Sequence, residues 1–255
     1  MNILLSNDDG FGAVGLECLF QEINKISSAI VIAPHQERSS CGHGITLHEP
    51  LRINKVAPNH YECSGTPADC ILIGLGHVCK KQRPDLVISG INNGANLGQD
   101  RYYSGTIAAA REACFREVPS IAVSLVINRG DEEHFFNTAA KFVSKLVGLG
   151  VDKAIPPMCL LNINVPNCSE EEISGAKITF PGFQKYSEEI LERIDFKGKK
   201  YFWVGGLHKG HKDIGGSDCN SVNDKFISLN IQCFSDKHNV DTKKLEEIIS
   251  KLDDG

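Results

Sequence analysis

The stretch "LLSNDDGFGAVG", residues 4–15, runs from a short apolar segment through a turn into the start of a helix. Its three glycines have the G-x-G-x-x-G spacing of a dinucleotide-binding turn. Asp8 and Asp9 stand directly before the first of these glycines, where two carboxylates would repel a phosphate. The pair therefore needs an explanation that a bare phosphate cradle does not supply.

The size and charge of the chain narrow the classes of protein to consider. Its 255 residues suit one large domain, and we expect residues 1–255 to form a single unit. With 27 basic and 32 acidic residues, the net charge is −5. That balance does not favour a surface for nucleic acid or for an anionic membrane. We expect neither a nucleic-acid polymer nor a membrane among the partners.

The cysteines and the N-terminus bear on the cellular compartment. None of the ten cysteines forms a C-x-x-C pair, and Cys70, Cys114 and Cys159 lie in apolar runs, where a thiol behaves as a small hydrophobic group. The N-terminus enters a strand directly, without a basic leader, and no apolar run reaches the length of a membrane span. We therefore expect a reduced, cytoplasmic protein.

The first 150 residues alternate between strand-like and helix-like segments. The predicted strands are continuous apolar runs, which is typical of a parallel sheet covered on both faces. The sequence thus predicts an α/β fold with a mostly parallel sheet flanked by helices. Strands are expected at 2–6, 29–34, 85–90 and 120–126, and helices at 13–27, 67–79, 104–115 and 132–147.

The last 100 residues have a different character. Strand-like segments follow at 159–165, 176–180, 200–206 and 226–232, with one helical pattern at 240–252. Residues 184–200 are charged and contain no turn signal before Gly198, which indicates a long β-hairpin extending from the body. We expect 184–235 to be a β-rich arm that makes contacts between copies of the chain.

Polar loops follow the first three strands of the predicted parallel sheet. The first strand is followed by Asp8 and Asp9, the second by the loop 35–44, and the third by the asparagine-rich loop 91–103. Because the carboxyl ends of parallel strands meet at one edge, these loops should lie together. They offer carboxylates, hydroxyls and carboxamides, which are the ligands of a hard cation such as Mg²⁺ or Mn²⁺.

A cation at this edge explains the two carboxylates. The acids hold the metal, and the metal holds a phosphate that the acids alone would repel. The N-terminus of the helix at 104–115 provides a second element that favours an anion. His43 is a candidate proton donor for the leaving oxygen, although an ordinary solvated loop histidine is an equal alternative.

Five stretches of the first half form an ordered set: "ILLSNDDG" at 3–10, "VIAP…RS…G…IT" at 31–46, "GTPADC" at 65–70, "SGIN.G.NLG" at 89–98 and "YSGTIAAAREA" at 103–113. In this order and spacing they resemble the SurE family of survival proteins, which are metal-dependent 5'-nucleotidases. The resemblance is clear over residues 1–128, and "LNINVP" at 161–166 extends it.

The resemblance implies a fold, a ligand set and an activity. The family has a Rossmann-like core and a C-terminal β-arm exchanged between subunits, which implies a homodimer or a homotetramer. Its metal ligands fall on Asp8, Asp9, Ser39 and Asn92 of this chain. The family removes phosphate from nucleoside monophosphates, and some members act on 3'-phosphates or short polyphosphates.

The leading hypothesis is a phosphatase with one Mg²⁺ or Mn²⁺ per subunit. Asp8 and Asp9 are the catalytic carboxylates, either as metal ligands that activate water or, in a variant, as the nucleophile of an aspartyl-phosphate. The phosphate site is completed by Asn96, Ser104, Gly105 and Thr106.

Two alternatives stay open. One is a nucleotide-binding sensor that has kept the cradle and lost turnover. The other is a nicotinamide-dependent oxidoreductase. Glu37 lies 22 residues after Gly15, where such a protein carries its ribose-binding acid, but Asp8 and Asp9 do not fit that pattern.

Two positions depart from the family pattern. Where the family usually has Ser-Gly, this chain has Ser39-Ser40, and the ligand could shift to Ser40, although counting from "AP" favours Ser39. Near the end of the chain, Lys225 replaces a glycine, which puts the local turn in doubt.

Overall fold

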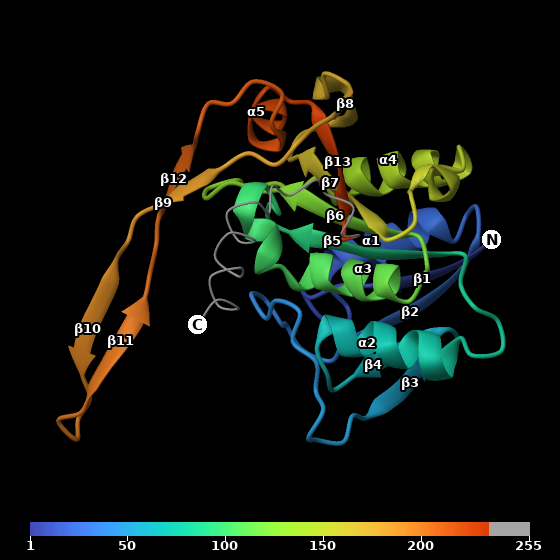
Figure 1. The fold of residues 1–255 in the computed structure, drawn as a ribbon, viewed down its shortest axis with the longest axis horizontal. Coiled ribbons are helices and arrows are strands. Elements are labelled where there is room, and N and C mark those ends of the chain that lie inside the picture. Colours follow the sequence, from blue (N-terminus) through green and yellow to red (C-terminus); the bar gives the residue numbers. More distant parts are fainter. Residues whose placement is uncertain (235–255) are drawn as a thin grey trace, which may run out of the picture.

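The computed structural model describes residues 1–234 and has a central nine-stranded sheet with helices on both faces (Figure 1). The strand order is β3-β4-β2-β1-β5-β6-β7-β13-β8. The strands from β4 to β7 in that order all run parallel, as predicted. The strands of this sheet are β1 (Asn2–Ser6), β2 (Ser28–Pro34), β3 (Ile53–Ala57), β4 (His60–Cys63), β5 (Leu86–Asn93), β6 (Ser120–Val126), β7 (Cys159–Pro166), β8 (Ala176–Ile178) and β13 (Ile227–Cys233).

The helices lie in two layers that match the alternation of apolar residues in the strands. Ile3 and Leu5 of β1 pack with α1 and α4, whereas Leu4 packs with α2 and α3 on the other face. Both faces of the strand are therefore buried, which explains its continuous apolar run. The helices are α1 (Val14–Ile23), α2 (Pro67–Ile73), α3 (Gly105–Phe115), α4 (Phe136–Gly148) and the short α5 (Asp218–Asn223).

The order of the strands creates a switch point between β1 and β5. The chain proceeds from β1 to β2 on one side of the sheet and returns to place β5 on the other side of β1. In open α/β sheets, ligands bind beyond the carboxyl ends of the strands at such a point. Residues 7–10 and 92–97 occupy that position, so the predicted meeting of these two loops is confirmed.

Several predicted boundaries are displaced. The helix expected at 67–79 is α-helical to Ile73 and continues as a π-helical turn at Gly74–Val78. Helix α5 was not predicted, because six residues are too few to show a helical period. The helix expected at 240–252 lies outside the described residues.

The predicted hairpin is present and extends from the body (orange in Figure 1). It consists of β10 (Ile190–Ile194) paired antiparallel with β11 (Lys200–Val204), joined to the body by a root in which β9 (Gln184–Tyr186) pairs with β12 (His208–His211). The arm is shorter than the expected 184–235, because β13 lies in the main sheet between β7 and β8. Residue patterns alone could not separate a strand of the arm from a strand of the body.

The expectation that all cysteines are reduced is wrong for one pair. Cys159 in β7 and Cys233 in β13 form a disulfide, while the other eight cysteines are free. The antiparallel register of β7 and β13 places the two residues opposite each other, although 74 positions separate them in the sequence. Spacing along the chain cannot reveal such a contact.

The structure also bears on membrane insertion. Within residues 1–234, none of the helices has both the length and the apolar character needed to cross a membrane.

Candidate active site

Asp8 lies at the carboxyl end of β1, buried against the start of α3. Its exposed fraction is 4%, and its Oδ1 accepts a hydrogen bond from the Thr106 hydroxyl. A Cβ added to Gly105 would come within 2.8 Å of the Asp8 Cβ, so the close approach of helix and acid requires glycine there. Burial raises the pKa of Asp8, although the Thr106 hydroxyl and the backbone amides of Gly105 and Thr106 act in the opposite direction.

Asp9 is the more exposed member of the pair. Its Oδ2 accepts a hydrogen bond from the backbone amide of Asn93 at 3.1 Å, which connects the loop after β1 to the end of β5. Burial, followed by the charges of Asp8 and Glu37, raises the pKa of Asp9 from 3.8 to about 6. No lysine, arginine or histidine among the described residues forms an ion pair with Asp8 or Asp9. When the pair is ionised, its negative charge is therefore not balanced by a cationic side chain within residues 1–234.

The loop after β2 is attached to this centre through its backbone. The amide of Arg38 donates to the Asp8 carbonyl at 2.7 Å. Ser39 is exposed, and its hydroxyl donates to the Glu37 carboxylate at 2.6 Å. Ser40 has a φ of 57°, the left-handed conformation that favours glycine. Ser40 therefore corresponds to the glycine of the family's Ser-Gly pair, and Ser39 corresponds to its serine.

Asn92 lies at the end of β5 beside Ser124 of β6. Its side-chain nitrogen donates to the Gly94 carbonyl at 2.8 Å, so its amide oxygen is the atom left for a ligand. Oxygen donors from β1 and β5 therefore meet at the switch point, as the sequence predicted.

The residues expected to bind phosphate lie on this same side of the sheet. Ser104 caps α3, where its hydroxyl accepts from the Ile107 amide at 3.1 Å. Gly105 and Thr106 follow and are in contact with Asp8. Asn96 is buried, and its side-chain nitrogen donates to the Ser124 hydroxyl at 2.8 Å.

His43 is held by α3 and is not free in the loop. Its Nε2 lies 3.0 Å from the Glu112 carboxylate, and its ring stacks on Phe115 with the centroids 5.7 Å apart. Glu112 also accepts from Arg116 Nε at 2.9 Å. One ring nitrogen of His43 is therefore engaged in a structural contact, which weakens the case for a proton donor.

The glycine pattern has a structural explanation that needs no dinucleotide. Gly10 has a φ of 100°, and a Cβ there would lie 3.1 Å from the backbone of Gln36. A Cβ on Gly15 would lie 2.1 Å from the Ile91 carbonyl oxygen. The glycines thus form a turn and allow α1 to pack closely on β5.

Sequence reasoning missed two kinds of residue at this edge. Asn162 and Asn164 of β7 reach the loop that carries Asn96, and the "LNINVP" stretch was the available signal. Cys41 also lies here, since its Sγ would be 3.1 Å from a Cβ on Gly105. Burial and then the charge of Asp8 raise the pKa of this thiol.

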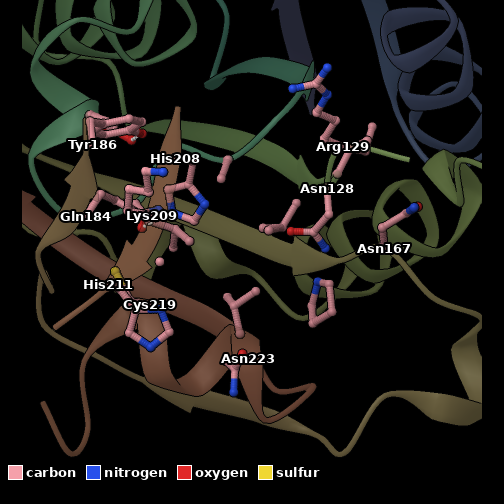
Figure 2. Close-up of a pocket in the computed structure, with 18 of the residues that line it drawn as sticks. Asn128, Arg129, Asn167, Gln184, Tyr186, His208, Lys209, His211, Cys219 and Asn223 are labelled. Carbon is pink, nitrogen blue, oxygen red and sulfur yellow. Dashed lines mark hydrogen bonds between the residues drawn. The ribbon is translucent and has the colours of Figure 1, made fainter. Parts of the chain in front are cut away.

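A cavity of about 1050 Å³ lies along the same edge of the sheet, beyond the ends of β6 and β7. Ala95 and Leu97, the neighbours of Asn96, form part of its wall. Figure 2 shows Asn128 and Arg129 on one side of the cavity and Tyr186 and His208, from the root of the arm, on the other. The loop of Asn96 thus separates the acid pair from a space large enough for a small organic molecule.

The family model described as "Survival protein SurE" matches residues 3–188 of the chain. The chain belongs to the SurE family. The resemblance inferred from the motifs is therefore confirmed, and the match extends beyond residue 128 to the root of the arm.

Curated relatives support this assignment over most of the chain. The protein named "5'-nucleotidase SurE" from Myxococcus xanthus (strain DK1622) is 43% identical over 228 residues, covering 89% of this chain and 85% of its own. The protein of the same name from Alkaliphilus metalliredigens (strain QYMF) is 39% identical over 257 residues, covering 97% of this chain and 98% of its own.

A solved structure agrees with the fold. The crystal structure of the SurE protein from Aquifex aeolicus superposes with a TM-score of 0.85 at 34% identity, covering 98% of this chain and all of that one. The α/β architecture with a mostly parallel sheet is therefore that of a SurE protein.

Proposed function

We propose that this SurE protein is a divalent-metal-dependent phosphatase that hydrolyses nucleoside 5'-monophosphates to nucleoside and phosphate. The observation that carries the proposal is the carboxylate pair at the switch point, which lacks a cationic partner among the described residues and faces the start of α3. The relatives named 5'-nucleotidase SurE support the substrate class.

The donor set fits one Mg²⁺ or Mn²⁺ per subunit. Asp8 and Asp9 supply carboxylates and Asn92 supplies an amide oxygen, which are ligands for a hard cation. Ser39 is the fourth proposed ligand, and its hydroxyl would turn from Glu37 to take part. No group of three or more His, Cys, Asp or Glu side chains in residues 1–234 is arranged as a metal cluster, so amide and hydroxyl oxygens must complete the set. A cation bound here would neutralise the phosphate charge and lower the pKa of a bound water.

The protein groups around this position orient the phosphate. Ser104, Gly105 and Thr106 place the positive end of the α3 dipole beside it, and Asn96 offers an amide from the adjoining loop. Thr106 also holds Asp8 in one orientation. If Asp8 or Asp9 instead attacks phosphorus directly, an aspartyl-phosphate forms, and trapping a phosphoryl-enzyme would identify that variant.

The cavity beside Asn96 offers room for the nucleoside. Nucleoside 3'-monophosphates and short polyphosphates are proposed as further substrates, since their phosphates present the same group to the metal. A small ester such as p-nitrophenyl phosphate, which leaves the cavity empty, should show a higher KM than a nucleoside monophosphate.

We also propose that residues 1–255 form one domain and that its arm joins subunits into a homodimer or a homotetramer. Phe196, Phe202 and Trp203 are exposed on the hairpin, and large apolar side chains on an extended arm are typical of a contact surface. We keep a cytoplasmic location as a proposal, because eight of the ten cysteines are free and only Cys159 and Cys233 form a disulfide.

Phosphate release from a panel of nucleoside monophosphates tests the proposal. Metal-stripped protein should be inactive, and added Mg²⁺ or Mn²⁺ should restore release. Asp9→Asn should lower kcat at least about a thousandfold, because it removes a metal ligand. Asp85→Asn is the matched control: Asp85 is exposed at the opposite edge of the sheet, where it accepts from the Asn2 amide at 2.7 Å. Nucleotide binding without release would favour the sensor, and cofactor binding that survives Asp8→Asn would favour the oxidoreductase.

A further inference from the structure

Strand β7 carries two asparagines in a setting that usually excludes them. All eight residues of Cys159–Pro166 are buried, and the two asparagines lie in the middle of this strand. Asn162 and Asn164 are 1% and 0% exposed, and their alternation places both on the same face. A buried amide is costly unless it is hydrogen-bonded, so the contacts of these side chains are informative.

Both asparagines bind the backbone of a single loop residue. The amide of Asn96 donates to Asn164 Oδ1 at 2.8 Å, and its carbonyl accepts from Asn164 Nδ2 at 3.2 Å. The same carbonyl accepts from Asn162 Nδ2 at 3.0 Å. The two side chains thus act on Asn96 as a neighbouring strand would, by pairing its N–H and its C=O.

The side chain of Asn96 is fixed from a third direction. Its Nδ2 donates to the hydroxyl of Ser124, which lies next to Asn164 in the register of β6 and β7. Ser124 also lies next to Asn92, the proposed metal ligand, in the register of β5 and β6. One row of side chains across three strands therefore connects the metal-ligand position with the loop of Asn96.

We propose that Asn164, assisted by Asn162, is a positioning residue for the phosphatase reaction. It holds the backbone of Asn96 in place. The side-chain amide of Asn96 is then presented to the substrate phosphate at a fixed distance from Asn92. This inference rests on the proposed function, because the loop has a phosphate to position only if the protein is a phosphatase. Asn162 and Asn164 touch no reacting atom and act only through Asn96.

A purely structural role is the competing explanation, and Asn230 distinguishes the two. Asn230 lies in β13 opposite Asn162, is 4% exposed, and donates to the Thr179 carbonyl at 2.8 Å. It is a buried asparagine of the same sheet, and within residues 1–234 its side chain forms no hydrogen bond with the loop of Asn96. Asn230→Ala therefore reproduces the stability cost of losing a buried amide without disturbing the loop.

The experiment compares Asn164→Ala, Asn162→Ala and Asn230→Ala in the metal-loaded protein. Steady-state kinetics with a nucleoside monophosphate, inhibition by inorganic phosphate and thermal melting are measured for each. We expect Asn164→Ala to lower kcat about ten- to a hundredfold and to weaken phosphate inhibition, as outer-shell changes commonly do. Asn162→Ala should have a smaller effect of the same kind, because both hydrogen bonds between Asn164 and the Asn96 backbone remain.

Asn230→Ala should lower the melting temperature by a similar amount while leaving kcat within about twofold. If Asn164→Ala does not fold, Asn162→Ala provides the same comparison. An unchanged kcat in the β7 variants, with active wild type, would overturn the inference alone. Equal losses of kcat in the β7 and β13 variants would also overturn it. Absence of phosphate release by wild-type protein would refute the proposed phosphatase, and the inference would fall with it.

Discussion

The two halves of the proposed site differ in how firmly the protein holds them. The inner half, formed by Asp8, Asp9, Asn92 and Thr106, is tied by hydrogen bonds between β1, β5 and α3. The outer half, formed by Ser39 and Ser40, is exposed and lies between two attachments of its loop, the Arg38 amide on the Asp8 carbonyl and the Gly42 amide on the Tyr103 carbonyl. In such a site, the inner half has its charge and geometry fixed before any ligand binds. The outer half completes the set of metal ligands only when the metal is bound. Changes in the inner half should therefore be much more damaging than changes in the outer half.

Among the changes that leave every proposed metal ligand in place, Gly105→Ala should produce the largest effect. The added Cβ would lie 2.8 Å from the Asp8 Cβ and 2.9 Å from its Oδ2, so the acid must move. We expect kcat/KM to fall at least about a hundredfold, with a loss of about 1–3 kcal/mol in the free energy of unfolding. Gly148→Ala is the control, because a Cβ at the end of α4 meets nothing within 4 Å. Full activity in Gly105→Ala would show that the inner half is not rigid.

The pKa of Asp9 predicts a pH dependence of metal binding. The carboxylate must lose its proton to bind a cation, so the affinity for Mn²⁺ should fall about tenfold per pH unit below a pH of about 6. Titration of metal-free protein with Mn²⁺ at pH 5, 6, 7 and 8 measures this. An affinity constant across that range would contradict a role for Asp9 as ligand.

The same pKa predicts the stability of the metal-free protein. Folding raises the pKa of Asp9 from 3.8 to about 6, so between these values the folded state holds a proton that the unfolded state has lost. The contribution of Asp9 to the free energy of unfolding should therefore fall as the pH rises from about 4 to 6. Relative to wild type, Asp9→Asn should gain about 1–2 kcal/mol between pH 4 and pH 8, a value reduced for the partial exposure of the side chain. Melting curves without metal at the two pH values test the sign.

Ser39→Ala should have a modest effect if the outer half only completes the site. The hydroxyl is exposed and bonded to Glu37, and water can replace it as a ligand. We expect kcat/KM to fall about three- to tenfold. Ser40→Ala serves as the neighbouring control and decides which of the two serines is used. A larger loss in Ser40→Ala than in Ser39→Ala would move the ligand to Ser40.

The smallest expected effects concern the two departures from the family pattern. Ser40 and Lys225 both have positive φ, 57° and 60°, in positions where the family has glycine. Ser40→Gly and Lys225→Gly should each relieve about 1 kcal/mol of backbone strain. Ser40→Gly should leave activity nearly unchanged. Thermal melting measures the gain in stability of the two variants. Glu117→Gly, at another position of positive φ (58°), provides the reference for the same relief of strain elsewhere in the chain.

The inner half was predictable because its signals are local. A continuous apolar run followed by Asp8 and Asp9 indicates a buried strand that ends in two acids, and parallel strands bring their carboxyl ends to one edge. The start of α2 depends on equally local features, because Pro67 stands at its first position and Thr66 forms a capping box with Asp69. Such features depend on residues within a few positions of each other.

The missed features depend on contacts between distant residues. The Cys159–Cys233 disulfide requires the register of β7 and β13, and the hydrogen bonds of Asn164 require the position of a loop 68 residues away. The orientation of the Ser39 hydroxyl toward Glu37 depends on the path of an exposed loop. No spacing or periodicity in the sequence encodes these contacts.

Calorimetric titration of metal-free protein with Mn²⁺ tests the central claim most directly, with wild type, Asp9→Asn and Ser39→Ala compared at pH 7.5. The account predicts one site per subunit, a loss of affinity of at least about a hundredfold in Asp9→Asn and of no more than about tenfold in Ser39→Ala. Equal affinity in wild type and Asp9→Asn would contradict the assignment of the metal to the carboxylate pair at the end of β1.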